Sequence, residues 1–185
     1  MTSQGLDRDA IAKSIADASL LRGTFTLRSG RTSSYYLDKY RFSTCPEVLG
    51  PLADLFAERI AAIAADCGGV DRLAGAELGG IPLVAATCLK TGHPTLFVRN
   101  AKKDYGTAKQ LEGVVEKGDK VVFLEDVATT GGQALEAVKV LTEAGAEVVA
   151  IVCTIDRLEG ARENIEGAGI RFEALFTKRD LGVDE

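Results

Sequence analysis

The stretch VVFLEDVATTGG, residues 121–132, joins an apolar run to two adjacent carboxylates and then to a turn of threonines and glycines. The run KVVFL (120–124) has the composition of a buried strand, and a helical pattern begins at Gln133. In an open α/β sheet, ligands bind beyond the carboxyl ends of the strands. Glu125 and Asp126 are predicted to lie at such an end, so this stretch predicts both a parallel sheet and a binding site.

The chain on either side of this stretch alternates between strands and helices. Apolar strands are predicted at 72–76, 95–99 and 147–155, helices at 81–92 and 133–144, and a last strand at 171–176 that pairs at the sheet edge. Continuous apolar strands separated by helices indicate a sheet that is covered on both faces. We therefore predict an α/β fold with a central, mostly parallel sheet and helices on both faces.

Residues 1–70 do not follow this alternation. They predict a helix at 7–20, a β-hairpin with strands at 24–27 and 34–39, and a helix at 47–66 that follows Pro46. We expect a small N-terminal hood lobe (1–70) packed on an α/β core (71–185), the two forming a single compact unit.

Composition restricts the possible partners. The chain has 185 residues, 46% of them hydrophobic, and a net charge of −5, which argues against a general nucleic-acid or anionic-membrane surface. The polar N-terminus does not resemble a signal peptide, and no apolar run is long enough to span a membrane. The four cysteines form no C-x-x-C pair and only one histidine is present, so a zinc site is not expected. We expect a cytoplasmic protein with reduced thiols.

The turn after the acidic pair has the chemistry of a phosphate site. Thr129 and Thr130 supply hydroxyl donors, and Gly131 and Gly132 leave the backbone N–H groups open at the start of a helix. Carboxylates beside a phosphate site make sense if the ligand is a sugar phosphate whose hydroxyls bind the acids. The alternative is that Glu125 and Asp126 only flank the helix and that the glycines only serve the turn.

An apolar strand followed by Glu-Asp and a threonine- and glycine-rich turn resembles the phosphoribosyl-pyrophosphate (PRPP) signature of the type I phosphoribosyltransferases. Within that family the chain resembles the orotate phosphoribosyltransferases. The matching segments, in the family's order, are FTLRSGRTSSYYLD (25–38), GAELGGIPL (75–83), FVRNAKKDYGT (97–107), EDVATTGGQ (125–133) and TIDRLEGAR (154–162).

This resemblance implies the transfer of a 5-phosphoribosyl group from PRPP to orotate, giving orotidine 5′-monophosphate and pyrophosphate in de novo UMP biosynthesis. It implies Lys103 as the main catalytic lysine, with Glu125 and Asp126 on the ribose hydroxyls. The other implied PRPP-binding residues are Arg28, Gly79, Arg99, Lys102, Tyr105, Val127, Ala128, Thr129, Thr130, Gly131, Gly132 and Gln133. The implied orotate-binding residues are Tyr36, Leu37, Thr129 and Arg157, the last of these on the orotate carboxylate.

The resemblance also implies Mg²⁺ as a cofactor that is carried by PRPP, with few or no direct protein ligands, and a homodimer whose active sites are shared across the interface. Three positions depart from the pattern common in bacterial relatives. Asn100 and Gly79 stand where a lysine is frequent, and Tyr105 stands where a histidine is frequent.

Three other functions remain open at this point. A transferase for a purine, xanthine or uracil would share the PRPP signature, but a purine has no carboxylate that needs Arg157. A PRPP-sensing regulator of the same fold would usually lack the lysine loop and carry a nucleic-acid surface. A plain interaction module would leave the strand-end carboxylates and the glycine turn unexplained.

Overall fold

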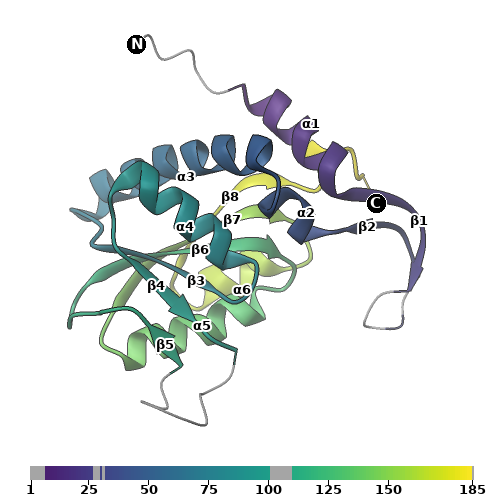
Figure 1. Cartoon of the computed structure of the whole chain (residues 1–185). Coiled ribbons are helices and arrows are strands. Elements are labelled where there is room, and N and C mark those ends of the chain that lie inside the picture. Colours follow the sequence, from purple (N-terminus) through teal and green to yellow (C-terminus); the bar gives the residue numbers. More distant parts are fainter. Residues whose placement is uncertain (1–6, 27–29, 31, 101–109, 185) are drawn as a thin grey trace, which may run out of the picture.

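The computed structural model describes residues 7–26, 30, 32–100 and 110–184. Within these ranges a six-stranded sheet has the order β5-β4-β3-β6-β7-β8 (Figure 1). All neighbouring strands are parallel except β5, which is antiparallel to β4. The strands are β3 (Arg72–Ala76), β4 (Thr95–Val98), β5 (Leu111–Glu112), β6 (Lys120–Ala128), β7 (Glu147–Asp156) and β8 (Arg171–Thr177). The predicted edge position of the last strand is confirmed.

Helices cover both faces of the sheet, as predicted (Figure 1). One face carries α3 (Pro46–Cys67) and α4 (Gly80–Thr91), and the other carries α5 (Gly132–Glu143) and α6 (Ala161–Gly167). Helix α6 was not predicted, because its seven residues are too few to show a helical period. None of the described helices combines the length and the apolar character needed to cross a membrane.

Strand β6 shows why both faces must be covered. Val122 and Leu124 pack into the hydrophobic cluster beneath α3 and α4, whereas Val121 and Phe123 pack into the cluster beneath α5. All four side chains are completely buried. Because alternate side chains of a strand point to opposite faces, an unbroken apolar run requires packing on both sides.

The N-terminal residues form α1 (Arg8–Ser19), a two-stranded hairpin of β1 (Leu20–Thr26) and β2 (Thr32–Leu37), and α2 (Lys39–Ser43). The predicted hairpin is confirmed, although β1 begins four residues earlier than predicted. The second strand ends at Leu37, so the prediction of a strand through Lys39 was wrong: Lys39 is the first residue of a helix.

The division into a lobe and a core at residue 70 stays a prediction. Ile15 of α1 and Phe56 of α3 are fully buried in the same cluster as Leu124 of β6. This shared cluster ties the N-terminal elements to the sheet.

One boundary that matters for function differs from the prediction. Strand β6 continues to Ala128, so Glu125 and Asp126 lie inside the strand and not beyond its end. The physical reason is β7, which is long enough to pair Val127 with Ile155 and Ala128 with Asp156. Backbone hydrogen bonding to the neighbouring strand therefore holds both acidic residues in a fixed direction.

Replacing Gly75 in β3 by alanine should destabilise the fold. A Cβ at this position would lie 2.6 Å from Val84 Cγ2 and 2.8 Å from the Gly80 carbonyl oxygen, so α4 would have to move away from the sheet. We expect Gly75→Ala to lower the free energy of unfolding by about 1–3 kcal/mol in urea titrations. Gly167→Ala is the control, because no atom lies within 4 Å of the added methyl group. Equal stability of the two variants would contradict this packing.

Candidate active site

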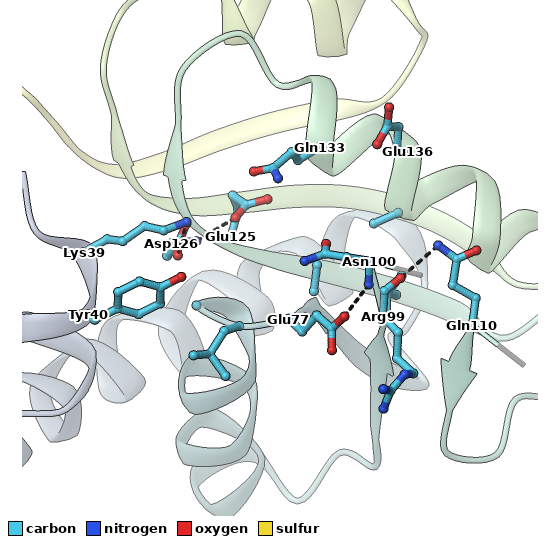
Figure 2. Close-up of a pocket in the computed structure, with 15 residues that line it drawn as sticks. Lys39, Tyr40, Glu77, Arg99, Asn100, Gln110, Glu125, Asp126, Gln133 and Glu136 are labelled. Carbon is cyan, nitrogen blue, oxygen red and sulfur yellow. Dashed lines mark hydrogen bonds and ion pairs between the residues drawn. The ribbon is translucent and has the colours of Figure 1, made fainter. Parts of the chain in front are cut away.

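A pocket of about 320 Å³ opens where β3, β4 and β6 end (Figure 2). Its charged walls come from five parts of the chain, namely α2, the β3–α4 turn, the end of β4, β6 and α5. The charged side chains among its described walls are Lys39, Glu77, Arg99, Glu125, Asp126 and Glu136.

The Asp126 carboxylate is the most enclosed polar group of the pocket, with a side chain only 1% exposed. The backbone N–H of Val127 donates to its Oδ1 at 2.6 Å, and Lys39 Nζ donates to the same oxygen at 3.3 Å. Lys39 Nζ also lies 2.9 Å from Oδ2 as an ion pair. That second oxygen is buried and accepts no hydrogen bond of good geometry from the residues that the structure describes.

Gly79 allows this placement of Asp126. A Cβ at residue 79 would lie 1.5 Å from Asp126 Oδ2, so no side chain fits there while the carboxylate keeps its position. The glycine that stands where bacterial relatives often have lysine therefore has a steric reason in this chain. Its predicted role, contact with the PRPP pyrophosphate, stays a prediction.

Glu125 lies beside Asp126 and has an unusual ionisation. Burial, followed by the negative charge of Asp126, raises the pKa of Glu125 to about 8, and Lys39 offsets only part of this effect. Glu125 therefore holds a proton near neutral pH and can donate a hydrogen bond to a ligand oxygen, while Asp126, paired with Lys39, can accept one.

The predicted phosphate turn encloses a second, smaller cavity of about 60 Å³. Its walls include all of residues 127–134, and Glu125 and Gln133 line both this cavity and the larger pocket. Gly131 has a φ of 77°, and a Cβ there would lie 2.9 Å from Ile165, so glycine is required for two reasons. Helix α5 begins next to it at Gly132, with its positive dipole end towards the turn.

The end of β4 forms the rim of the larger pocket. The Gln110 side-chain amide donates to the Arg99 carbonyl at 2.9 Å, and the Asn100 N–H donates to Glu77 Oε1 at 2.6 Å (Figure 2). Asn100 and Gln110, which flank residues 101–109, both line the pocket. The predicted site residues Lys102, Lys103 and Tyr105 lie outside the described residues, as does Arg28.

Arg157 follows β7 and lies beside the phosphate turn, because its backbone N–H donates to the Ala128 carbonyl at 2.9 Å. Its guanidinium donates to the Tyr35 hydroxyl at 3.2 Å, lies 5.5 Å from that ring, and pairs with Glu159 at 2.9 Å. The hairpin and the end of β7 therefore meet at Arg157.

The other predicted orotate contacts are placed less directly. Tyr36 packs on Phe25 with ring centroids 5.7 Å apart, and Leu37 packs against the core cluster beneath α3 and α4. Neither residue is among the described walls of the two cavities, whereas Thr129 lines the smaller one. The roles of all three in binding orotate stay predictions.

Lys39, Glu77 and Glu136 line the pocket but were not among the predicted site residues, and the contact of Tyr35 with Arg157 was not predicted. Lys39 contacts Asp126 across 87 positions of sequence, and no local pattern distinguishes it from the other lysines. Glu77 carried a usable signal, because it stands within the quoted segment GAELGGIPL at the end of a predicted strand.

The described residues include no group of three or more His, Cys, Asp or Glu side chains that could hold a metal ion. Asp126 Oδ2 is the buried acceptor in the pocket that is left without a hydrogen bond of good geometry from the described residues. Because this oxygen is buried and pairs with Lys39, the described residues fit an ion that is held mainly by its ligand, with few or no direct protein contacts.

Replacing Glu125 by glutamine should make stability less dependent on pH. Because the folded state raises the pKa of Glu125 to about 8, wild-type stability should fall as pH rises from the unfolded-state pKa through about 8. We expect Glu125→Gln to gain stability relative to wild type in urea titrations at pH 8.5 and to gain less at pH 5. Glu143→Gln, at an exposed glutamate of α5, is the control. Parallel pH profiles for wild type and Glu125→Gln would contradict the raised pKa.

Comparisons with known proteins agree with this geometry. Residues 48–173 match the family model of the phosphoribosyl transferase domain. An orotate phosphoribosyltransferase of Natronomonas pharaonis is 48% identical over 88% of this chain and 89% of its own. The crystal structure of Mycobacterium tuberculosis H37Rv orotate phosphoribosyltransferase in complex with Fe(III) dicitrate has a TM-score of 0.83 at 32% identity, covering 96% of this chain and 99% of that one. The same enzyme in complex with PRPP has a TM-score of 0.79 at 32% identity, with the same coverage. The chain belongs to the orotate phosphoribosyltransferase family.

Proposed function

We propose that this protein transfers the 5-phosphoribosyl group of PRPP to orotate, forming orotidine 5′-monophosphate and pyrophosphate in de novo UMP biosynthesis. The observation that carries the proposal is that the two cavities are neighbours, since Glu125 and Gln133 line both. An acidic wall for sugar hydroxyls thereby adjoins a turn suited to a phosphate. The names of the similar proteins support the choice of orotate.

The phosphoribosyl group would bind across the two cavities. Its 5′-phosphate would occupy the turn at residues 127–133, where backbone N–H groups and the start of α5 favour an anion. Its ribose hydroxyls would bind the acidic pair, one meeting the Asp126 carboxylate and one the Glu125 carboxyl. Strand β6 fixes both acids, so the ribose would be held in one orientation.

Breaking the bond between C1′ and pyrophosphate builds positive charge on the ribose and leaves a polyanion. The negative charge of Asp126 stabilises the positive charge that builds on the ribose, and cations at the pocket rim stabilise the departing pyrophosphate. Arg99 lies on that rim, and we propose that Lys102 and Lys103 join it, with Lys103 the main catalytic lysine. Mg²⁺ carried by PRPP would neutralise part of the pyrophosphate charge, with few or no direct protein ligands.

Arg157 would recognise the orotate carboxylate, because a planar guanidinium can donate two parallel hydrogen bonds to it. Tyr35 supports this role by holding the guanidinium from the hairpin side. A purine offers no carboxylate in its place, which favours orotate over a purine as the acceptor.

We further propose a cytoplasmic homodimer whose active sites are completed across the interface. This proposal rests on the family resemblance alone. Analytical ultracentrifugation of the purified protein tests the dimer.

The proposed reaction can be followed by the ultraviolet absorbance of orotate. With protein, PRPP and Mg²⁺ present, we expect orotate absorbance to fall, and added pyrophosphate should restore it. Leaving out PRPP or Mg²⁺ should abolish the change. An unchanged signal with orotate, together with turnover of adenine, hypoxanthine or uracil, would replace orotate by another acceptor.

Replacing Lys103 by alanine should reduce kcat by about 10²–10³-fold, the usual effect of losing one preorganised group that stabilises developing charge. The control is Lys139→Ala, at an exposed lysine of α5. Lys102→Ala separates the two neighbouring lysines. A Lys103→Ala variant with wild-type kcat, next to a strongly impaired Lys102→Ala variant, would move the catalytic role to Lys102.

A further inference from the structure

The described walls of the larger pocket carry more acidic than basic side chains. Among its described walls, three carboxylates (Glu77, Asp126 and Glu136) and Glu125, which holds a proton near neutral pH, face two cations, Lys39 and Arg99. Arg99 lies at the rim, with its guanidinium 3.7 Å from Glu112. A polyanionic phosphoribosyl donor would therefore meet like charge at the place where its ribose must bind, unless a cation stands next to the acids.

Lys39 is that cation. It comes from α2 in the N-terminal part of the chain, and Figure 2 shows its side chain reaching across to Asp126. Its Nζ contacts both carboxylate oxygens, at 2.9 Å and 3.3 Å. Burial alone would lower the pKa of Lys39, but the charge and the hydrogen bond of Asp126 raise it above its usual range. The ammonium group is therefore positively charged at every pH at which such an enzyme works.

The surroundings of Asp126 leave its carboxylate little choice of orientation. Gly79 borders Oδ2, the Val127 N–H donates to Oδ1, and Lys39 spans the two oxygens. Without Lys39, an almost fully buried carboxylate would stand next to Glu125 with no cation in contact. Two adjacent buried carboxylic groups without a counter-ion retain a proton between them more strongly.

We propose that Lys39 is a positioning residue for the phosphoribosyl donor: it fixes the orientation of the Asp126 carboxylate, and it offsets the acidic charge so that a polyanionic sugar phosphate can bind. This inference rests on the proposed function, because it assigns the acidic pair to the ribose. It predicts that the loss of Lys39 affects the KM for PRPP more than the KM for orotate. Lys39 contacts Asp126, whereas Arg157, the residue proposed for orotate, makes a separate contact with Tyr35.

The test compares Lys39→Met, which keeps the length and removes the charge, with Lys39→Arg, which keeps the charge. The matched control is Lys90→Met, because Lys90 also forms an ion pair, 2.8 Å from Asp54, but near the end of α4 remote from the pocket. For each protein, kcat and the KM values for PRPP and for orotate are measured between pH 6 and 9, and the melting temperature confirms folding.

We expect Lys39→Met to lower kcat/KM for PRPP by about 10–100-fold, the effect of losing a hydrogen bond between charged groups. The acid limb of its pH profile should move to higher pH, because the charge of Lys39 lowers the pKa of Glu125 and its removal makes that carboxyl harder to deprotonate. Lys39→Arg should keep the wild-type acid limb, and Lys90→Met should match wild type. The proposal would be overturned if the acid limb of Lys39→Met does not move, or if Lys39→Arg loses as much kcat/KM for PRPP as Lys39→Met does.

Two further measurements separate a folding defect from a binding defect, and failure of this inference from failure of the proposed function. If Lys39→Met does not fold, Lys39→Gln replaces it, with the same shift of the acid limb expected. Calorimetric titration of PRPP with Mg²⁺ into wild type and Lys39→Met does not require turnover, and weaker binding to the variant is expected. Wild-type inactivity towards orotate would refute the proposed function, whereas an active wild type with an unaffected Lys39 variant would refute only this inference.

Discussion

The buried carboxylate of Asp126 is the group on which the arrangement of the site depends. Its side chain is 1% exposed, and a charged group can stay at that depth only if other groups replace its water. In this fold the Val127 N–H and Lys39 do so, while Gly79 leaves the necessary space. Strand β6, the β3–α4 turn and α2 must therefore come together before the pocket exists. Folding of the N-terminal part and formation of the site are thus linked.

The sheet provides the rigidity that this arrangement needs. Because β6 pairs with β7 through Ala128, the acidic residues sit on hydrogen-bonded backbone, while the residues that follow turn into α5. Rigid acids next to a glycine turn suit a ligand with hydroxyls at one end and a phosphate at the other. The same rigidity explains why Glu125 has a raised pKa: the strand holds it beside Asp126, in a place where water cannot solvate a second charge well.

Local patterns predicted the fold class because the apolar strands and amphipathic helices have distinct periods. The run KVVFL indicated a strand buried on both faces, and the clusters on either side of β6 confirm it. Short elements were not predicted, because an element is recognised in the sequence by a visible period. Helix α2 has five residues and α6 has seven, which is too little for a period to appear. The end of β6 was placed four residues too early, because pairing with β7 extends the strand through polar residues.

The sequence by itself determined the α/β fold, the acidic pair, the phosphate turn and the resemblance to orotate phosphoribosyltransferases, because each of these is encoded in neighbouring residues. Only the tertiary structure could show that Lys39 contacts Asp126, that Gly79 is needed for that carboxylate, and that Tyr35 holds Arg157. These contacts join segments far apart in the chain. Which lysine reaches which carboxylate depends on how the hairpin, α2 and the sheet pack together, and no local pattern of residues records that packing.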